Sequence, residues 1–155
     1  MQLVPREAAK SYIADCVAVA RDLPEFFTEA GVQSLETDAQ HHALYVDSVG
    51  DKVVAFVVVA TKSKSVREIL WMAVRPGMQG MGIGSTMLAD IEGALRADGA
   101  RLIEVRTLAA TASYPPYERT RRFYERAGFV LLETIHPYPG WDQDSPCAIY
   151  VKPLG

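Results

Sequence analysis

A glycine-rich turn between two patterned segments constrains the fold more than any other feature of this sequence. The stretch VRPGMQGMGIGS, Val74 to Ser85, follows the apolar run EILWMAV, and RLIEVRTL comes later, after Gly99. Between the turn and Gly99, apolar residues recur at helical spacing, which predicts a helix. They are Ile83, Met87, Leu88, Ile91 and Leu95. Strand, turn, helix and strand form a βαβ unit, whose two strands are parallel.

The segments before this unit predict two helices and a hairpin. Apolar residues at three- and four-residue steps predict a helix from Ala8 to Arg21. PEFFTEA predicts a second short helix closing at Gly31, and a less regular continuation through VQSLETDAQ is the alternative. HALYVDS and KVVAFVVVA flank a turn at Gly50 and predict antiparallel strands.

The segments after the unit complete a mixed sheet. PPYERTRRFYERAG predicts a helix that begins at its prolines and ends at Gly128. FVLLETI and PCAIYVKPL predict a closing hairpin around the loop HPYPGWDQDS. We therefore expect one α+β domain spanning residues 1–155, with a central mixed sheet flanked by helices.

Composition excludes several classes of protein. With 16 Lys and Arg against 19 Asp and Glu, the net charge of −3 argues against nucleic acid or a membrane surface as a partner. The longest apolar run, VVAFVVVA, is too short to span a bilayer, and the charged start MQLVPREAAK argues against a signal peptide. Cys16 and Cys147 lack a paired spacing, which favours a reducing cytoplasm.

The glycine turn also predicts an anion site. The first N–H groups of a helix are unpaired and carry partial positive charge, so they stabilise a phosphate. Gly80, Gly82 and Gly84 would let it approach the backbone closely. A turn whose glycines serve only flexibility and helix packing is the alternative. The G-x-G-x-x-G fingerprint is absent from GMGIG, and Ile83 stands where a nucleotide-triphosphate loop needs lysine.

QGMGIG resembles the Q/R-x-x-G-x-G/A signature of the GCN5-related N-acetyltransferase (GNAT) superfamily, and FYERAGF resembles its F-Y-x-x-x-G-F segment. The order of elements agrees from about Leu44 to Leu154. The resemblance implies acetyl-CoA as co-substrate, bound where two parallel strands splay apart. It implies pairing of the pantetheine arm with the strand and contacts of the pyrophosphate with turn N–H groups. The implied residues are Met72, Ala73 and Val74 on the strand, and Gln79, Gly80, Met81, Gly82, Ile83, Gly84 and Ser85 in the turn.

Tyr124 occupies the position that supplies the acid to the departing thiolate in this family. Tyr117, Thr120 and Tyr124 share one face of the predicted helix, because they stand at i, i+3 and i+7, whereas Phe123 is expected to turn into the core. A tyrosine that only packs against the coenzyme is the alternative.

Glu68 is the candidate general base, because it resembles the glutamate that withdraws the amine proton in the histone-acetylating branch. Simple alternation would put Glu68 on one strand face with Leu70, Met72 and Val74. One alternative is that ordered water or another residue acts as the base. The other is that Glu68 is simply exposed at the start of the strand. Glu104 is a reserve candidate.

Other features receive ordinary interpretations. No ligand spacing surrounds the histidines, so no metal is expected. The run ERTRRFYER is read as a solvated helix face, with contact of one arginine with a coenzyme phosphate as the alternative. The loop HPYPGWDQDSP, together with Tyr114 and Tyr117, could enclose a cationic amine or form only a surface turn.

The resulting prediction is an acetyl-CoA-dependent N-acetyltransferase that acts by direct attack of a primary amine, with a small-molecule amine preferred. A protein lysine or N-terminal acetyltransferase is one alternative. A non-catalytic acyl-CoA-binding regulatory module is another. A homodimer is compatible with the sequence.

Overall fold

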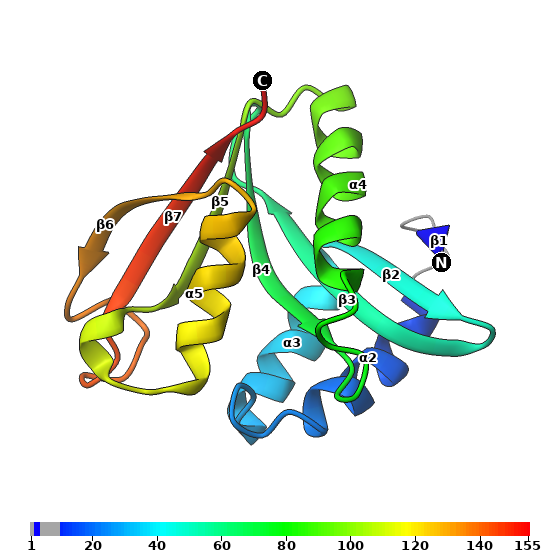
Figure 1. The fold of residues 1–155 in the computed structure, drawn as a ribbon, viewed down its shortest axis with the longest axis horizontal. Coiled ribbons are helices and arrows are strands. Elements are labelled where there is room, and N and C mark those ends of the chain that lie inside the picture. Colours follow the sequence, from blue (N-terminus) through cyan, green and yellow to red (C-terminus); the bar gives the residue numbers. More distant parts are fainter. Residues whose placement is uncertain (1, 4–9) are drawn as a thin grey trace.

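The computed structural model describes residues 2–3 and 10–155 of the chain (Figure 1). Its helical elements are η1 (Lys10–Tyr12), α2 (Ile13–Arg21), α3 (Glu29–His41), α4 (Ile83–Ala97), η2 (Ala110–Ala112) and α5 (Pro116–Arg126). Its strands are β1 (Gln2–Leu3), β2 (Ala43–Val49), β3 (Lys52–Thr61), β4 (Val66–Val74), β5 (Leu102–Leu108), β6 (Val130–Ile135) and β7 (Cys147–Pro153).

One predicted helix boundary is not tested by the described residues, and another needs correction. The start of the first helix at Ala8 lies outside the described residues, and the described helical segment begins with η1. PEFFTEA does not form a helix closing at Gly31, whereas the continuation through VQSLETDAQ is helical. Instead, α3 begins at Glu29, because Thr28 Oγ1 accepts the N–H of Gly31 at 3.0 Å and caps the helix that contains this glycine.

The strands form a seven-stranded mixed sheet in the order β1-β2-β3-β4-β5-β7-β6. Strands β4 and β5 pair in parallel, and the other neighbours pair antiparallel. The helix α4 connects β4 to β5, so the predicted α+β fold and its βαβ unit are confirmed.

Helices cover both faces of the sheet, and β3 is buried between them. Phe56 and Val58 belong to a core cluster with α2 and α3, whereas Val57 and Val59 belong to a second cluster with α4 and Tyr124 of α5. Alternate residues of a strand point to opposite faces. The two clusters therefore define an α2/α3 face and an α4/α5 face.

The parallel pair β4–β5 is short. Val66 to Ile69 pair with Leu102 to Val105, and beyond these residues the two strands separate. Figure 1 shows them together near the C-terminus of the chain and diverging toward the other end of the sheet. The splayed strands that the resemblance implied are thus present.

A β-bulge accompanies this separation. Val58 pairs with Trp71 and Val59 pairs with Ile69, which leaves Leu70 as the extra residue of β4. A bulge shifts the side-chain alternation by one residue. The half of β4 that follows Leu70 therefore presents its side chains in the opposite phase.

Candidate active site

A cleft occupies the opening between β4 and β5. It is lined by the end of β4, the glycine turn, one face of α5, the loop between α2 and α3, and the loop between β6 and β7. Nine of the ten residues expected to bind the coenzyme line this cleft, and so do the two candidate catalytic residues, Glu68 and Tyr124.

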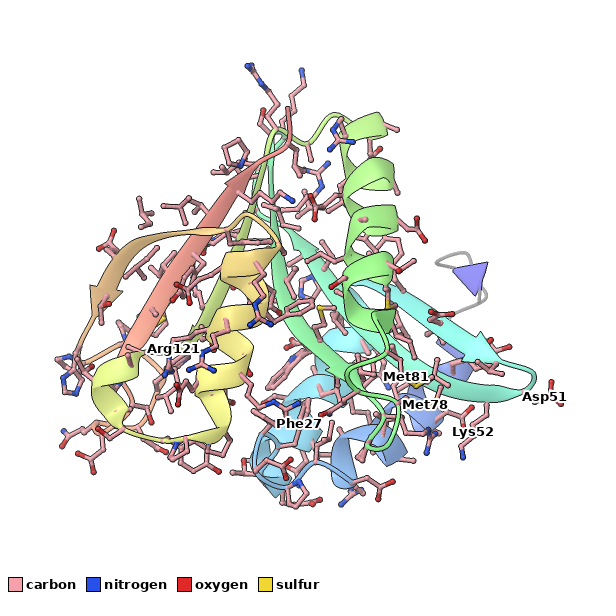
Figure 2. All side chains as sticks on the ribbon, viewed as in Figure 1. Phe27, Asp51, Lys52, Met78, Met81 and Arg121 are labelled. Atoms are coloured by element: carbon pink, nitrogen blue, oxygen red, sulfur yellow. The ribbon has the colours of Figure 1, made fainter. Side chains whose placement is uncertain are left out.

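 Met81, which Figure 2 labels, is the exception and is 66% exposed.

The end of β4 offers free main-chain groups to this cleft. Met72, Ala73 and Val74 pair with β3 along one edge of the strand, and β5 has already separated from the other edge. Backbone N–H and C=O groups that lose a strand partner retain a strong tendency to form hydrogen bonds. This edge therefore fits an extended amide-containing arm lying along the strand.

The turn after β4 places helix N–H groups at the mouth of the cleft. Gly80 and Gly82 have φ angles of 80° and 78°, and a Cβ on either would meet nothing within 4 Å. Their left-handed backbone, rather than crowding, is thus what favours glycine here. The Gln79 side chain supports the turn by donating from Nε2 to the Val74 carbonyl at 3.1 Å.

The first turn of α4 is well suited to an anion. Gly82 is its N-cap and has no side chain to bond the first N–H groups, and the helical ladder begins with the Thr86 N–H donating to the Gly82 carbonyl at 3.0 Å. No acidic residue lies in this first turn. Arg119, Arg122 and Arg126 line the same cleft from α5. These donors and charges fit a diphosphate.

Gly84 has a different role from its neighbours. A Cβ at this position would lie 3.2 Å from Cε1 of the Phe123 ring, so the glycine allows α5 to pack closely against the start of α4. Phe123 is half-buried at this contact, whereas Tyr124 is the buried member of the pair. Phe123 packs against the α4/α5 core cluster, as expected, but it is only partly buried and also borders the cleft.

Tyr124 lies on the α5 face that borders the cleft, together with Tyr117 and Thr120. Its hydroxyl donates to Sδ of Met72 at 3.8 Å, and its ring makes edge contacts with Phe123 and Phe129 at centroid distances of 5.2 and 5.3 Å. Burial raises the pKa of the phenol well above its usual value. The hydroxyl therefore keeps its proton at neutral pH and can donate it in a hydrogen bond.

Glu68 lies on the α2/α3 face of the sheet. It is opposite Ala60 in the register, whereas Met72 is opposite Val57 and packs against the α4/α5 cluster. The predicted alternation of Glu68 with Met72 and Val74 is wrong, because the bulge at Leu70 reverses the phase between them. Glu68 instead shares its face with Trp71.

Two cations flank the Glu68 carboxylate. Lys62 Nζ lies 3.5 Å from its Oε1, and Arg106 Nε lies 3.6 Å from its Oε2. Burial raises the pKa of Glu68, an effect that Arg106 and Lys62 oppose and that Glu104 reinforces. A carboxylate with a raised pKa is a better proton acceptor than an exposed one. The sequence did not single out Lys62 or Arg106, although the alternation of Glu104 with Arg106 on one strand was a usable signal.

Aromatic side chains form the wall of the cleft on the α2/α3 face. Trp71 stacks on Phe27 at 5.5 Å, and its Nε1 donates to Asp38 at 2.8 Å. Phe26 makes an edge contact with Tyr117 at 5.2 Å. Trp71 was read from the sequence only as a strand residue, because its role depends on the bulge.

Tyr114 connects the two sides of the opening. Its hydroxyl donates to the Glu25 carbonyl at 2.8 Å, which ties the start of α5 to the loop between α2 and α3. Tyr138 of the β6–β7 loop contacts Arg106 through its hydroxyl and Trp141 through its ring. The loop is therefore anchored at the cleft and is more than an isolated surface turn.

The remaining charged features have structural partners. Glu118 and Arg122 form an exposed i,i+4 pair, whereas Arg121 donates to the Leu108 carbonyl at 2.8 Å and thereby fixes α5 to β5 (Figure 2). His136 contacts the Gln143 carbonyl. Within residues 2–3 and 10–155, no group of three or more His, Cys, Asp or Glu side chains is arranged to hold a metal.

Comparison with known proteins gives a consistent family. A sequence model described as an acetyltransferase (GNAT) domain matches residues 37–131. No curated protein matches the chain. Among solved structures, a GNAT-family protein from Desulfovibrio desulfuricans has a TM-score of 0.77 and 21% identity, over 91% of this chain and 92% of that one.

Two further structures have similar folds. An aminoglycoside 6'-N-acetyltransferase complexed with coenzyme A has a TM-score of 0.76 and 16% identity, over 99% of this chain and 97% of that one. The ribosomal-protein-S18-alanine N-acetyltransferase from Escherichia coli has a TM-score of 0.75 and 17% identity, over 99% and 93%.

The fold and the cleft define an acyltransferase with a splayed parallel strand pair and a helix N-terminus at its mouth. The match to the family model covers more than half of the residues, and the chain belongs to the GNAT acetyltransferase family. The expected enzyme class is thereby confirmed, and the coenzyme A bound by a structural relative agrees with acetyl-CoA as co-substrate.

Proposed function

We propose that this protein transfers an acetyl group from acetyl-CoA to a primary amine by direct attack, with a small-molecule amine as acceptor. One observation carries the proposal. Glu68 and Tyr124 line the same cleft from opposite faces of the sheet, at the point where β4 parts from β5. A proton acceptor and a proton donor are thus available on the two sides of one opening.

The two residues answer the two proton problems of the transfer. An alkyl ammonium with a pKa of about 10.4 is almost fully protonated at neutral pH, so Glu68 would take a proton from the amine, directly or through water. The amine nitrogen forms a bond to the thioester carbonyl carbon, and the carbon–sulfur bond then breaks. The Tyr124 hydroxyl would donate its proton, or a hydrogen bond, to the departing sulfur.

The coenzyme would lie along the α4/α5 side of the cleft. The edge of β4 at Met72, Ala73 and Val74, which β5 does not cover, would pair with pantetheine amides, although the Val74 carbonyl already accepts a hydrogen bond from Gln79. The N–H groups of Gln79 to Ser85 would hold the pyrophosphate. The left-handed glycines and the bare N-cap of α4 support this arrangement.

The acceptor would lie on the α2/α3 side, against Trp71 and Phe26. The bridge from Tyr114 to the Glu25 carbonyl narrows this end of the cleft, which supports a small amine over an extended peptide. The similarity in fold to a ribosomal-protein N-acetyltransferase keeps a protein N-terminus or lysine as the second candidate.

An amine panel tests the proposal. Release of free thiol from acetyl-CoA would be followed with small amines and with peptides, beside Glu68→Gln and Tyr124→Phe. We expect stimulation by at least one small amine and slower turnover in both variants. Tight coenzyme binding without release by any amine would favour the non-catalytic regulatory module instead. Stimulation by peptides alone would favour the protein acetyltransferase.

Three broader expectations are part of this proposal. The whole chain, residues 1–155, would act as one N-acetyltransferase domain. A cytoplasmic location is supported by Cys16 and Cys147, which are both free and buried. None of the helices in the described ranges has the length and apolar character needed to cross a bilayer.

Self-association into a homodimer is the third expectation. The edge strand β6 exposes Val130, Leu131 and Leu132, which are 63%, 49% and 59% exposed, and a second copy could cover them. Sedimentation velocity of the parent and of Leu132→Lys would test it, because a dimer through this edge should dissociate in the variant.

A further inference from the structure

Four charged side chains surround the position where the amine proton would be taken up. Lys62 follows β3, Glu68 lies on β4, and Glu104 and Arg106 lie on β5. Each cation lies within 4 Å of both carboxylates. The four side chains form a ring whose formal charges cancel.

The contacts within this ring are unequal. Arg106 Nε donates to Glu104 Oε1 at 2.8 Å, whereas its distance to Glu68 Oε2 is 3.6 Å. Lys62 Nζ lies 3.4 Å from Glu104 Oε1 and 3.5 Å from Glu68 Oε1. Glu104 thus holds the close contact with the guanidinium, and Glu68 has only the longer one.

We propose that Glu104 is a positioning residue that keeps Glu68 reactive by holding Arg106 away from it. The inference deepens the proposed function, since it rests on Glu68 as the base. A carboxylate in close contact with both a guanidinium and an ammonium is a weak proton acceptor, because its charged form is stabilised and its lone pairs are engaged. Glu104 takes the stronger of these contacts and adds a like charge beside Glu68.

The other groups on this side of the sheet do not replace Glu104. Tyr138 of the β6–β7 loop accepts a hydrogen bond from Arg106 Nη1 and so fixes the far side of the guanidinium. Cys147 at the start of β7 lies in the field of the ring, but burial raises the pKa of its thiol to about 11, so it stays neutral. Asp38 on α3 accepts a hydrogen bond from Trp71.

The proposal predicts that two neighbouring substitutions shift the pKa of Glu68 in opposite directions. Glu104→Gln removes the competing carboxylate, so Arg106 and Lys62 act on Glu68 alone and lower its pKa. Arg106→Gln removes the cation that lowers the pKa of Glu68 most, and the pKa of Glu68 therefore rises. Each shift should be about one pH unit. The lower basicity in Glu104→Gln should also reduce the plateau rate by roughly threefold.

The experiment is the pH profile of kcat/KM, calculated on the concentration of unprotonated amine. The acid limb should move to lower pH in Glu104→Gln and to higher pH in Arg106→Gln. Glu92→Gln is the matched control, because Glu92 is also buried and forms an ion pair, with Lys152 at 2.7 Å, but on the α4/α5 face. It should leave the limb where it is in the parent. An unmoved limb in Glu104→Gln, or shifts of the same sign in both variants, would overturn the inference.

A second readout separates this inference from the proposed function. Carboxyl ¹³C resonances of labelled glutamate would be titrated in the unliganded protein, with the Glu68 signal assigned from Glu68→Gln. A lower Glu68 pKa in Glu104→Gln supports the inference even if enzyme assays fail. If Glu68→Gln turns over as fast as the parent, the assignment of Glu68 as base is overturned. If Glu68→Gln loses turnover but the pKa of Glu68 does not move in Glu104→Gln, only the role of Glu104 is overturned.

Discussion

The hydroxyl of Tyr124 has a weak partner in the free protein, the sulfur of Met72 at 3.8 Å. Tyr124→Phe should therefore change thermal stability very little but lower kcat by about 10- to 100-fold, because the group that would protonate the thiolate is lost. Steady-state kinetics with a fixed amine and differential scanning fluorimetry would measure both. A large fall in Tm with unchanged kcat would mean that the tyrosine only packs.

The same residue gives a prediction at alkaline pH. Burial raises the pKa of Tyr124, so the phenol stays protonated in the folded enzyme as the pH rises through the ordinary tyrosine value of about 10. We expect no loss of kcat from this group between pH 8 and about 10. An alkaline limb in that range that disappears in Tyr124→Phe would contradict this prediction.

Glycine substitutions test whether the backbone conformation or the space around the Cβ favours glycine at a position. Gly82→Ala should destabilise the protein by about 1 kcal/mol, because an alanine at a φ of 78° is strained even though its Cβ would meet nothing within 4 Å. Gly93→Ala in α4 is the matched control. Its Cβ also meets nothing and its backbone is helical, so it should stabilise by about 0.5–1 kcal/mol. Urea unfolding would measure both, and equal effects would refute the distinction.

At the level of elements, the loop between α2 and α3 is joined to the start of α5 on the side of the cleft that we propose for the acceptor. Tyr114→Phe removes the hydrogen bond to the Glu25 carbonyl, which is worth about 0.5–1.5 kcal/mol. We expect KM for the amine to rise about two- to tenfold while KM for acetyl-CoA stays unchanged. A rise in KM for acetyl-CoA instead would assign this contact to the coenzyme side.

The elements also explain how far the sequence could be read. Local periodicity and glycines predicted the βαβ unit and the helix around Tyr124, because these depend on residues close together in the chain. The splayed strand pair was implied only by the resemblance to the GNAT superfamily. The bulge at Leu70 depends on pairing between β3 and β4, which local periodicity does not reveal. Simple alternation therefore wrongly placed Met72 and Val74 on the same face as Glu68. The ring of Lys62, Glu104 and Arg106 arises from three segments that only the fold brings together.

For the whole molecule, the open end of β4 predicts that the coenzyme stabilises the fold. At a concentration of 100 times Kd, a ligand that binds only the folded state adds about 2.7 kcal/mol. For a domain of this size, this corresponds to an increase in Tm of roughly 5–10 °C. Scanning calorimetry with coenzyme A would measure it, and amide hydrogen exchange should slow at Met72 and Val74. Unchanged exchange at these residues would argue against binding along this edge.

The reversal of side-chain phase at Leu70 has a consequence for the kinetic order of the reaction. One strand presents Glu68 to one face and Met72 to the other. In the proposed arrangement, donor and acceptor would therefore have separate approaches and could occupy the enzyme together. Initial-rate plots at several fixed concentrations of the second substrate should therefore intersect. Parallel lines, the mark of an acetylated enzyme that forms after the first product has left, should not be found.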